Sequence, residues 1–298
     1  MSEASRMKIA GVQMDIKIME PELNLSNMEK AMRETTANGA ELTVFPECAV
    51  TGYCFSSLAE AMPWGESIPG KSSGFFQQVC AETNSYVVYG TLEKEGEQLF
   101  NVCVLVGPSG VIGSYRKIHL PFLGIDRFTT PGNRPFEVYD IGKIKVGMNI
   151  CYDGSFPESS RIMALDGADL VVLPTNWPPG AETFPKYIVN TRAVENKIFY
   201  AAVNRVGMER GFQFIGGSKI ISPNGDDQHF ANHKEYEILY GTVVPEDTRN
   251  KHIVRVPDEH EIHRFDDRHP EWYSRITDLS LIHISEPTRP ERIAYAVL

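Results

Sequence analysis

Two similar stretches, Gly39-Ala-Glu-Leu-Thr-Val-Phe-Pro46 and Gly167-Ala-Asp-Leu-Val-Val-Leu-Pro174, decide the fold class of this chain. Each contains a short, mostly apolar run that a proline ends, which is typical of a β-strand buried on both faces. Each follows a segment that suits a helix, and a further strand precedes that helix. Because such a strand needs helices on one face and a second sheet on the other, we predict an α/β sandwich of two sheets with helices outside.

Further predicted elements surround these two stretches. Strands are predicted at residues 7–14, 41–46, 86–91, 99–106, 111–115, 145–150, 168–174 and 199–204. Helices are predicted at residues 24–38, 73–83, 157–166 and 184–197. The first helix has apolar Leu25, Met28, Ala31 and Met32 at helical spacing. The charged turn at 93–98 predicts a hairpin between two of the strands.

Composition excludes several classes of protein. The chain has 298 residues, of which 42% are hydrophobic and 23% charged, as in ordinary globular proteins. The formal net charge of −10 argues against a nucleic-acid-binding surface, which needs concentrated basic residues. No apolar run approaches the roughly 20 residues of a membrane-spanning helix. The first residues lack the apolar segment of a secretion signal, so we expect a cytoplasmic protein with no nucleic-acid or membrane partner.

The end of the chain does not continue the pattern. From Leu279 onward, Leu279-Ser-Leu-Ile-His-Ile-Ser-Glu-Pro-Thr-Arg-Pro290 resembles translated sequencing adapter. We therefore expect residues 277–298 to be a C-terminal tail of non-native sequence; the alternative is a genuine extension that packs on a partner. No linker-like run divides the rest, so residues 1–276 are predicted to form a single domain.

The five cysteines are odd in number and lack the spacing of a zinc site or a disulfide framework. Cys151 differs from the others because it follows the apolar strand at 145–150 and precedes a predicted turn into a helix. A thiol on such a turn is lifted from the sheet edge, and the helix N-terminus beyond it favours a thiolate. Cys151 is therefore a candidate nucleophile, and the alternative is a core cysteine at a strand end.

Glu47 and Lys117 also follow predicted strands directly. A carboxylate at the carboxyl end of a strand lies where α/β sheets bind ligands, and partial burial raises its pKa toward the range of a general base. A lysine at such a position can stabilise an oxyanion and help to hold a thiolate. The alternative for both residues is ordinary solvated surface charge.

Together these residues resemble the carbon–nitrogen hydrolase, or nitrilase-like, superfamily. Three motifs match in order and separation: Val44-Phe-Pro-Glu-Cys-Ala-Val-Thr-Gly-Tyr53, Tyr115-Arg-Lys-Ile-His-Leu120 and Gly147-Met-Asn-Ile-Cys-Tyr-Asp153. The resemblance covers about residues 7–275. It implies a four-layer αββα sandwich of two mixed β-sheets with helices on the outer faces, and a Glu47–Lys117–Cys151 catalytic triad.

The resemblance also implies a mechanism without a metal or an organic cofactor. Cys151 attacks the carbonyl of a small amide, Glu47 acts as the general base, and Lys117 with the backbone N–H of Tyr152 holds the oxyanion. Many relatives carry a second glutamate at the position of Ile125. We expect Asp126 to take over its positioning role; the alternative is that Asp126 only pairs with Arg127. Relatives commonly form dimers, so the resemblance implies a homodimer or a larger assembly.

The residues after Cys151 indicate the branch of the superfamily. Tyr152-Asp153 stands where true nitrilases usually have Trp-Glu, so the resemblance favours an amidase. An N-carbamoyl amidohydrolase, a nitrilase, an acyltransferase with the same triad and a catalytically silent binding protein are the alternatives. The residues expected to line a pocket that holds a neutral acyl group follow sheet ends; they are Tyr53, Phe122, Asn176 and Trp177. For Trp177, core packing or a dimer contact is the alternative.

Overall fold

The computed structural model describes residues 6–231 and 234–278. Residues up to Lys251 belong to one compact unit, which contains two six-stranded sheets. In the first sheet the strand order is β14 (Glu237–Val243), β1 (Met7–Gln13), β2 (Leu42–Val44), β3 (Tyr86–Glu95), β4 (Gln98–Gly107) and β5 (Gly110–Arg116). In the second it is β13 (Asp227–Phe230), β12 (Lys219–Ile221), β9 (Phe199–Asn204), β8 (Leu170–Thr175), β7 (Lys145–Met148) and β6 (Val138–Asp140).

Both sheets are mixed, and the two repeated stretches have equivalent places in them. β2 lies parallel to β1 and β3, and β8 lies parallel to β7 and β9. Every residue of β2 and of β8 is buried. Gly39 and Gly167, with φ of +83° and +87°, adopt the left-handed conformation that ends the preceding helix. The expectation that these strands are covered on both faces is therefore confirmed.

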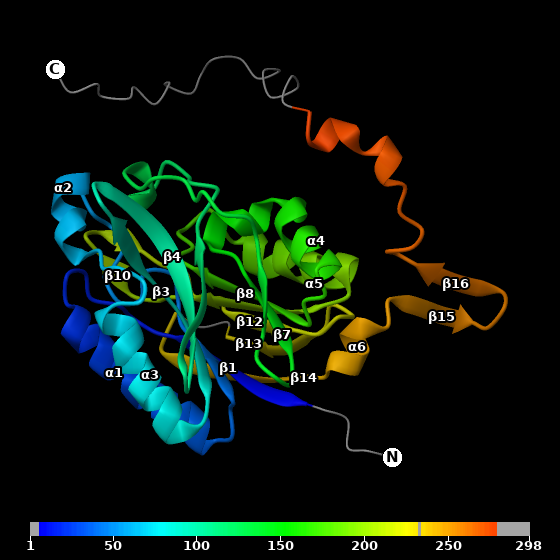
Figure 1. The fold of residues 1–298 in the computed structure, drawn as a ribbon, viewed down its shortest axis with the longest axis horizontal. Coiled ribbons are helices and arrows are strands. Elements are labelled where there is room, and N and C mark those ends of the chain that lie inside the picture. Colours follow the sequence, from blue (N-terminus) through cyan, green and yellow to red (C-terminus); the bar gives the residue numbers. More distant parts are fainter. Residues whose placement is uncertain (1–5, 232–233, 279–298) are drawn as a thin grey trace. The chain divides into compact units, whose positions relative to one another are not determined.

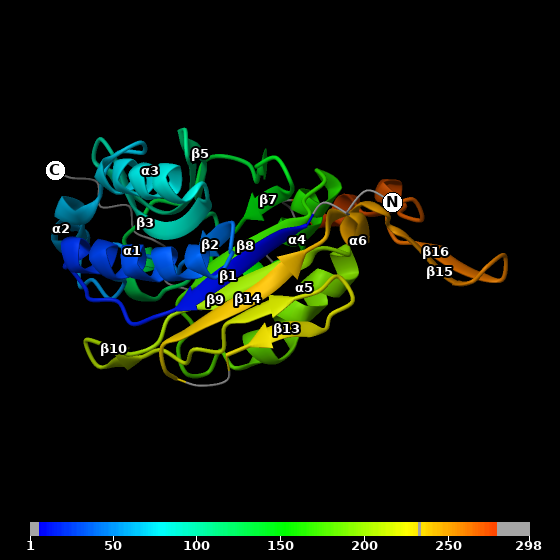
Figure 2. The same ribbon diagram turned by 90° about the horizontal axis from the view of Figure 1, so that it is seen from below.

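Helices cover the outer faces of the two sheets. Figures 1 and 2 show α1 (Pro21–Ala37) and α3 (Lys71–Thr83) together on one side, and α4 (Pro157–Leu165) and α5 (Val189–Asn196) together on the other. The sheets face each other, with β1 against β9 and β14 against β12. The predicted four-layer sandwich of two mixed sheets between helices is confirmed.

The helices begin and end close to their predicted limits, and the differences have local causes. α1 buries its predicted apolar face, Leu25, Met28, Ala31 and Met32, but begins earlier because Pro21 suits a first helical turn. The predicted helix at 184–197 begins as a wider π-helical turn, Phe184–Ile188, before α5. The sequence pattern did not predict the short hairpin of β10 (Met208–Glu209) and β11 (Phe212–Gln213), nor β6, β12, β13 and β14.

The remaining elements are short. α2 (Leu58–Ala61) and α6 (Pro245–Arg249) connect strands of the compact unit. Beyond it, β15 (His252–Val256) and β16 (His260–His263) form a hairpin that is followed by two single 3₁₀ turns, Pro270–Trp272 and Ser274–Ile276. A single domain over residues 1–276 remains a prediction, and most of the tail predicted at 277–298 lies outside the described residues. Within the described ranges, no helix is long and apolar enough to cross a membrane.

The turn after β2 lies against β3 at Gly90, where no side chain separates them. Gly90 donates its backbone N–H to the Pro46 carbonyl oxygen (3.1 Å) and accepts from the Val50 N–H (3.2 Å). A Cβ atom at Gly90 would collide with the Cys48 backbone nitrogen and lie 2.6 Å from the Pro46 carbonyl oxygen. Glycine at this position therefore lets the turn that contains Glu47 fold back onto the sheet.

We predict that Gly90→Ala lowers the free energy of unfolding by about 1–3 kcal/mol, because backbone atoms on both sides must move apart. Gly74→Ala is the matched control, because Gly74 lies in α3 and an added Cβ would meet nothing within 4 Å. Replacing a glycine by alanine within a helix should raise the free energy of unfolding by about 0.5–1 kcal/mol. Urea denaturation of both variants measures the difference. Equal stability of the two variants would contradict a tight contact at Gly90.

Candidate active site

The three candidate catalytic residues come from the ends of strands in both sheets. Glu47 lies in the turn after β2, and Lys117 directly follows β5, so both belong to the first sheet. Cys151 opens a short 3₁₀ helix, Cys151–Ser155, just after β7 of the second sheet. Glu47 and Lys117 are buried, and Cys151 is 7% exposed.

Lys117 is held between two buried carboxylates. Its Nζ lies 2.7 Å from Glu47 Oε1 and 2.6 Å from Asp126 Oδ2, and all three side chains have no solvent exposure. Burial alone would lower the pKa of Lys117, but the charges of Asp126 and Glu47 more than offset it and keep the pKa well above its usual value. Lys117 therefore remains an ammonium ion.

Glu47 has one oxygen with partners and one without. Oε1 accepts from Lys117 and from Asn101 Nδ2, the latter at 2.7 Å, whereas the buried Oε2 has no hydrogen-bond partner among the described residues. Burial raises the pKa of Glu47; the charge of Lys117 opposes this rise and that of Asp126 adds to it. A carboxylate with a raised pKa and a bare oxygen has the properties of a general base.

Asp126 lies within the short 3₁₀ helix Gly124–Arg127 and is fully buried. Besides Lys117, it accepts hydrogen bonds from Asn101 Nδ2 on Oδ1 (2.9 Å) and from the Tyr53 hydroxyl on Oδ2 (2.8 Å). Arg127 instead donates to the carbonyl oxygens of Gly124 and Phe55. The geometry of Asp126 therefore suits the positioning role expected for it. Asp126 lies one residue after Ile125, the position at which many relatives carry their second glutamate.

Cys151 lies on a strained turn. Its φ of +46° is unusual for a residue with a side chain. The turn is held by the buried Asp153, which accepts from the Ile150 N–H (2.9 Å), the Tyr115 hydroxyl (2.9 Å) and the His119 N–H (3.1 Å). Because Tyr115 and His119 flank Lys117 in the chain, Asp153 ties the cysteine turn to the segment that carries the lysine.

Burial of Cys151 acts against the thiolate form that the following helix N-terminus was expected to favour. Burial raises the pKa of the Cys151 thiol to about 12, and the charge of Glu47 adds to this rise. The charge of Lys117 and the polar groups of Thr175 and the Asn176 backbone oppose it, but they do not outweigh burial. The thiol therefore needs a neighbouring base to remove its proton, and Glu47 is the candidate for that role.

The residues expected to line a substrate pocket separate into two groups. Tyr53 and Phe122 line one pocket of about 350 Å³, with Phe122 81% exposed. Asn176 and Trp177 are buried and do not line it. Asn176 Nδ2 donates to the Glu47 carbonyl oxygen at 3.0 Å. Trp177 packs on Phe184, with ring centroids 5.5 Å apart, so its contact is with the core.

Tyr152 is half-buried and its ring meets Phe156 edge-on, with centroids 5.2 Å apart. Its backbone N–H remains a candidate oxyanion donor because it directly follows Cys151.

Asn101, which contacts both carboxylates, was missed by the sequence analysis. Only its place in β4, the strand beside β3 and β5, hints at this role.

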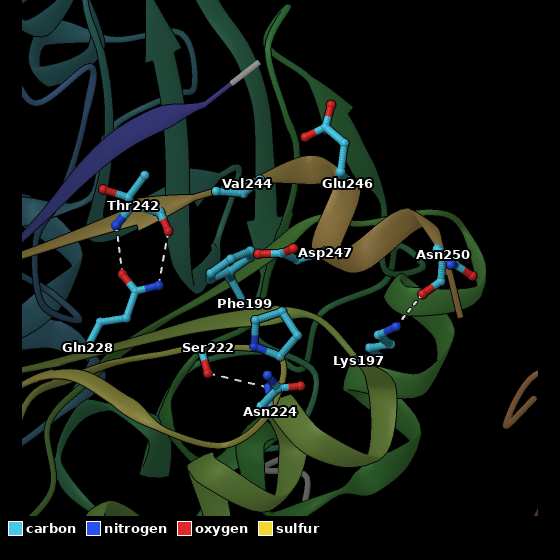
Figure 3. A pocket seen from close by; sticks show the side chains of 11 residues that line it. Lys197, Phe199, Ser222, Asn224, Gln228, Thr242, Val244, Glu246, Asp247 and Asn250 are labelled. Atoms are coloured by element: carbon cyan, nitrogen blue, oxygen red, sulfur yellow. Dashed lines mark hydrogen bonds between the residues drawn. The ribbon is translucent and has the colours of Figure 1, made fainter. Parts of the chain in front are cut away.

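A larger pocket lies elsewhere and contains none of the candidate residues. It has a volume of about 520 Å³ and is lined by residues of β9, β13, β14 and α6, with Lys197 and Asp247 among them (Figure 3). Figure 3 shows Gln228 bonded to the Thr242 backbone and Lys197 bonded to Asn250. Across the part of the chain that the structure describes, no group of three or more His, Cys, Asp or Glu residues could hold a metal ion.

We predict that Cys151 is a neutral thiol in the free protein from about pH 5 to about pH 8, because its pKa lies far above this range. The ultraviolet absorbance of thiolate, measured as wild type minus Cys151→Ser, should show no excess there. The other cysteines cancel in this difference. A titration step below about pH 8 would show that Lys117 outweighs burial, and would contradict this prediction.

Comparison with known proteins identifies the family of the chain. The family described as carbon-nitrogen hydrolase matches residues 8–252. The chain is 42% identical over 272 residues to a protein named nitrilase from Pyrococcus abyssi, covering 90% of this chain and 100% of that one. It is 30% identical over 235 residues to Omega-amidase NIT2-A of Xenopus laevis, covering 74% of this chain and 83% of that one.

A solved structure is also similar. It is a mutant of the amidase from Nesterenkonia sp. AN1, with acrylamide joined by Michael addition at the active-site cysteine of that enzyme. The TM-score is 0.74 at 25% identity, covering 91% of this chain and 99% of that one. The chain thus belongs to the carbon-nitrogen hydrolase family of the nitrilase superfamily, and it is an enzyme of the amidase or nitrilase type.

Proposed function

We propose that this enzyme hydrolyses the carbon–nitrogen bond of a small amide through an acyl thioester on Cys151. The observation that carries the proposal is the ammonium of Lys117, buried between Glu47 and Asp126. The charge of Glu47 also acts on the Cys151 thiol. A base, a cation and a thiol are the groups that acyl transfer requires, and water has little access to them here.

In the proposed first half-reaction, Glu47 Oε2 takes the thiol proton while the sulfur of Cys151 attacks the amide carbonyl carbon. The carbonyl oxygen becomes an oxyanion, which the Lys117 ammonium and the Tyr152 backbone N–H stabilise. When the carbon–nitrogen bond breaks, Glu47 returns the proton to the departing nitrogen. Ammonia or an amine leaves, and the acyl group remains on Cys151 as a thioester.

In the second half-reaction, Glu47 removes a proton from water, and the hydroxide attacks the thioester carbonyl. The carbon–sulfur bond then breaks, the proton returns to the sulfur of Cys151, and a carboxylic acid leaves. No metal or organic cofactor takes part in this scheme. Asp126 stays in contact with Lys117 throughout and acts as a positioning residue.

Amide rather than nitrile hydrolysis is supported by the residues after the nucleophile. Tyr152-Asp153 replaces the Trp-Glu of true nitrilases, and Asp153 accepts hydrogen bonds that hold the turn. One relative is named an omega-amidase and another a nitrilase, so both substrate classes are candidates. N-carbamoyl compounds are a third candidate class of substrate, and an acyl acceptor could take the place of water in the second half-reaction.

Charged residues near the pocket bear on the acyl group. Arg205 pairs with Glu209 (2.8 Å) and Arg210 with Glu60 (2.7 Å), so neither is available to clamp a substrate carboxylate. This supports the neutral acyl group that we expected. Arg127 and Arg210 line the pocket, and Arg127 has no carboxylate partner among the described residues. Substrates with and without a distal carboxylate should therefore be compared.

We predict that the enzyme releases ammonia from at least one class among aliphatic amides, ω-amides, N-carbamoyl compounds and nitriles. Cys151→Ala should lower that turnover at least a thousandfold, in the range of about 10³–10⁶ seen when a nucleophile is removed. An acyltransferase would instead transfer the acyl group to added hydroxylamine faster than to water.

Cys80→Ala is the matched control, because Cys80 is a buried cysteine of α3 whose thiol donates to the Val106 carbonyl oxygen, away from the charge cluster. This variant should retain turnover in proportion to its folded fraction. Undiminished ammonia release by Cys151→Ala would exclude Cys151 as the nucleophile.

We also predict that Phe122→Ala raises KM about tenfold with little change in kcat, because a bound substrate loses apolar contact worth about 1.4 kcal/mol. Trp272→Ala is the control, since Trp272 is 78% exposed and does not line the pocket. Steady-state kinetics with the best substrate of the panel measures both parameters. An unchanged KM in Phe122→Ala would place the substrate outside this pocket.

A further inference from the structure

Asn101 lies at the centre of the buried charge cluster. It is in β4, is 1% exposed, and its Nδ2 donates to Glu47 Oε1 at 2.7 Å and to Asp126 Oδ1 at 2.9 Å. One neutral amide thus bridges the two carboxylates that share Lys117. Its backbone carbonyl oxygen also accepts the Lys117 N–H at 2.8 Å, so the same residue holds the chain at the lysine.

The orientation of the Asn101 amide follows from its neighbours. Its Oδ1 faces the Cys48 thiol, which donates to it at 3.6 Å from Sγ. A rotated amide would place Oδ1 against two carboxylate oxygens, where it has nothing to accept. Both N–H groups of Nδ2 therefore point to the acidic groups.

This arrangement makes the two oxygens of Glu47 unequal. Oε1 accepts from both Lys117 and Asn101, whereas the buried Oε2 accepts from no described residue. The amide fixes the side chain through Oε1 and leaves Oε2 bare. A fixed carboxylate with one bare oxygen is prepared to take a proton from a thiol.

We propose that Asn101 is a positioning residue of the active site, which holds Glu47 with Oε2 free and keeps it ionised as the general base. This inference rests on the proposed role of Glu47. The bridging amide stabilises negative charge on both acids and is itself neutral. A second lysine in its place would add a positive charge. Because it donates to the ionised form of Glu47, removing it should favour the protonated form.

The other groups around Glu47 determine the direction of the effect. Lys117 is the cation that contacts Glu47, whereas Asp126, Cys151, Cys48 and Tyr53 are acidic groups of the surrounding turns. Tyr53 would have to give up its bond to Asp126 to replace the lost donor, and Cys48, which loses its acceptor together with the amide, offers only a weak thiol donor. Loss of the Asn101 amide should therefore move the protonation of Glu47 to higher pH, and the active form requires Glu47 deprotonated.

The test is the pH dependence of kcat/KM in Asn101→Leu, which has a similar volume but no donor. We expect the acid limb of this profile, the pH range over which kcat/KM falls as Glu47 is protonated, to move up by about one pH unit. This is the usual size of a shift from one charged hydrogen bond. Activity at neutral pH should fall and partly recover at higher pH, while KM changes less than about twofold. Asn101→Ser, too short to bridge both acids, should shift the limb in the same direction.

Asn196→Ala is the matched control, since Asn196 is a buried asparagine whose Nδ2 donates to the Arg192 carbonyl oxygen in α5. It should lower thermal stability without moving the acid limb. An acid limb at the wild-type pH in Asn101→Leu and Asn101→Ser, with activity reduced only in proportion to folded protein, would overturn the proposal.

A second readout separates this proposal from the proposed function. Alkylation of Cys151 by iodoacetamide, followed by mass spectrometry, requires a base for the thiol but no substrate turnover. If the acid limb of alkylation moves up in Asn101→Leu, the positioning role is supported even when wild type releases no ammonia from any amide. If wild type hydrolyses amides but neither limb moves in the variants, the role of Asn101 is excluded and the proposed function stands.

Discussion

The buried ion cluster around Lys117 is the interaction on which the rest of the proposed active site depends. One ammonium contacts two carboxylates, from the turn after β2 and from the short helix Gly124–Arg127, and all three side chains are fully buried. Removing one partner of such a pair typically costs about 3–5 kcal/mol because a charge is left uncompensated. The cluster therefore fixes the relative positions of three segments that are distant in sequence. It also leaves an excess of acid over base, which keeps Glu47 prone to accept a proton.

The sandwich brings a second set of groups to this cluster. Glu47 and Lys117 follow strands of the first sheet, and Cys151 follows β7 of the second. Asp153 joins them by accepting from Tyr115 at the end of β5 and from the Ile150 N–H beside the cysteine. Burial both protects this arrangement and raises the pKa of the thiol. Burial raises the pKa of Glu47 as well, so in the proposed mechanism the same desolvation acts on both the donor and the acceptor of the proton.

The strands, the buried face of α1 and the residues at strand ends were predictable because apolar periodicity and glycine or proline boundaries are local properties. Burial is not local, and three expectations depended on it. The turn was expected to favour a thiolate at Cys151, and Trp177 and Asn176 were expected to line a pocket; all three side chains are buried, and these expectations remain predictions. Asn101 gave no signal because an asparagine within an apolar strand resembles a tolerated polar residue until its partners are known. The strands after residue 204 were missed because they are short and weakly periodic.

The central claim is that Cys151 carries the acyl group during turnover. Rapid acid quenching of the enzyme during hydrolysis of its best amide, followed by proteolysis and mass spectrometry, tests it most directly. The account predicts an acyl mass on the peptide that contains Cys151 and on none of the peptides with Cys48, Cys54, Cys80 or Cys103. Steady turnover with no acyl adduct at any time after mixing, or an adduct on another cysteine, would contradict it.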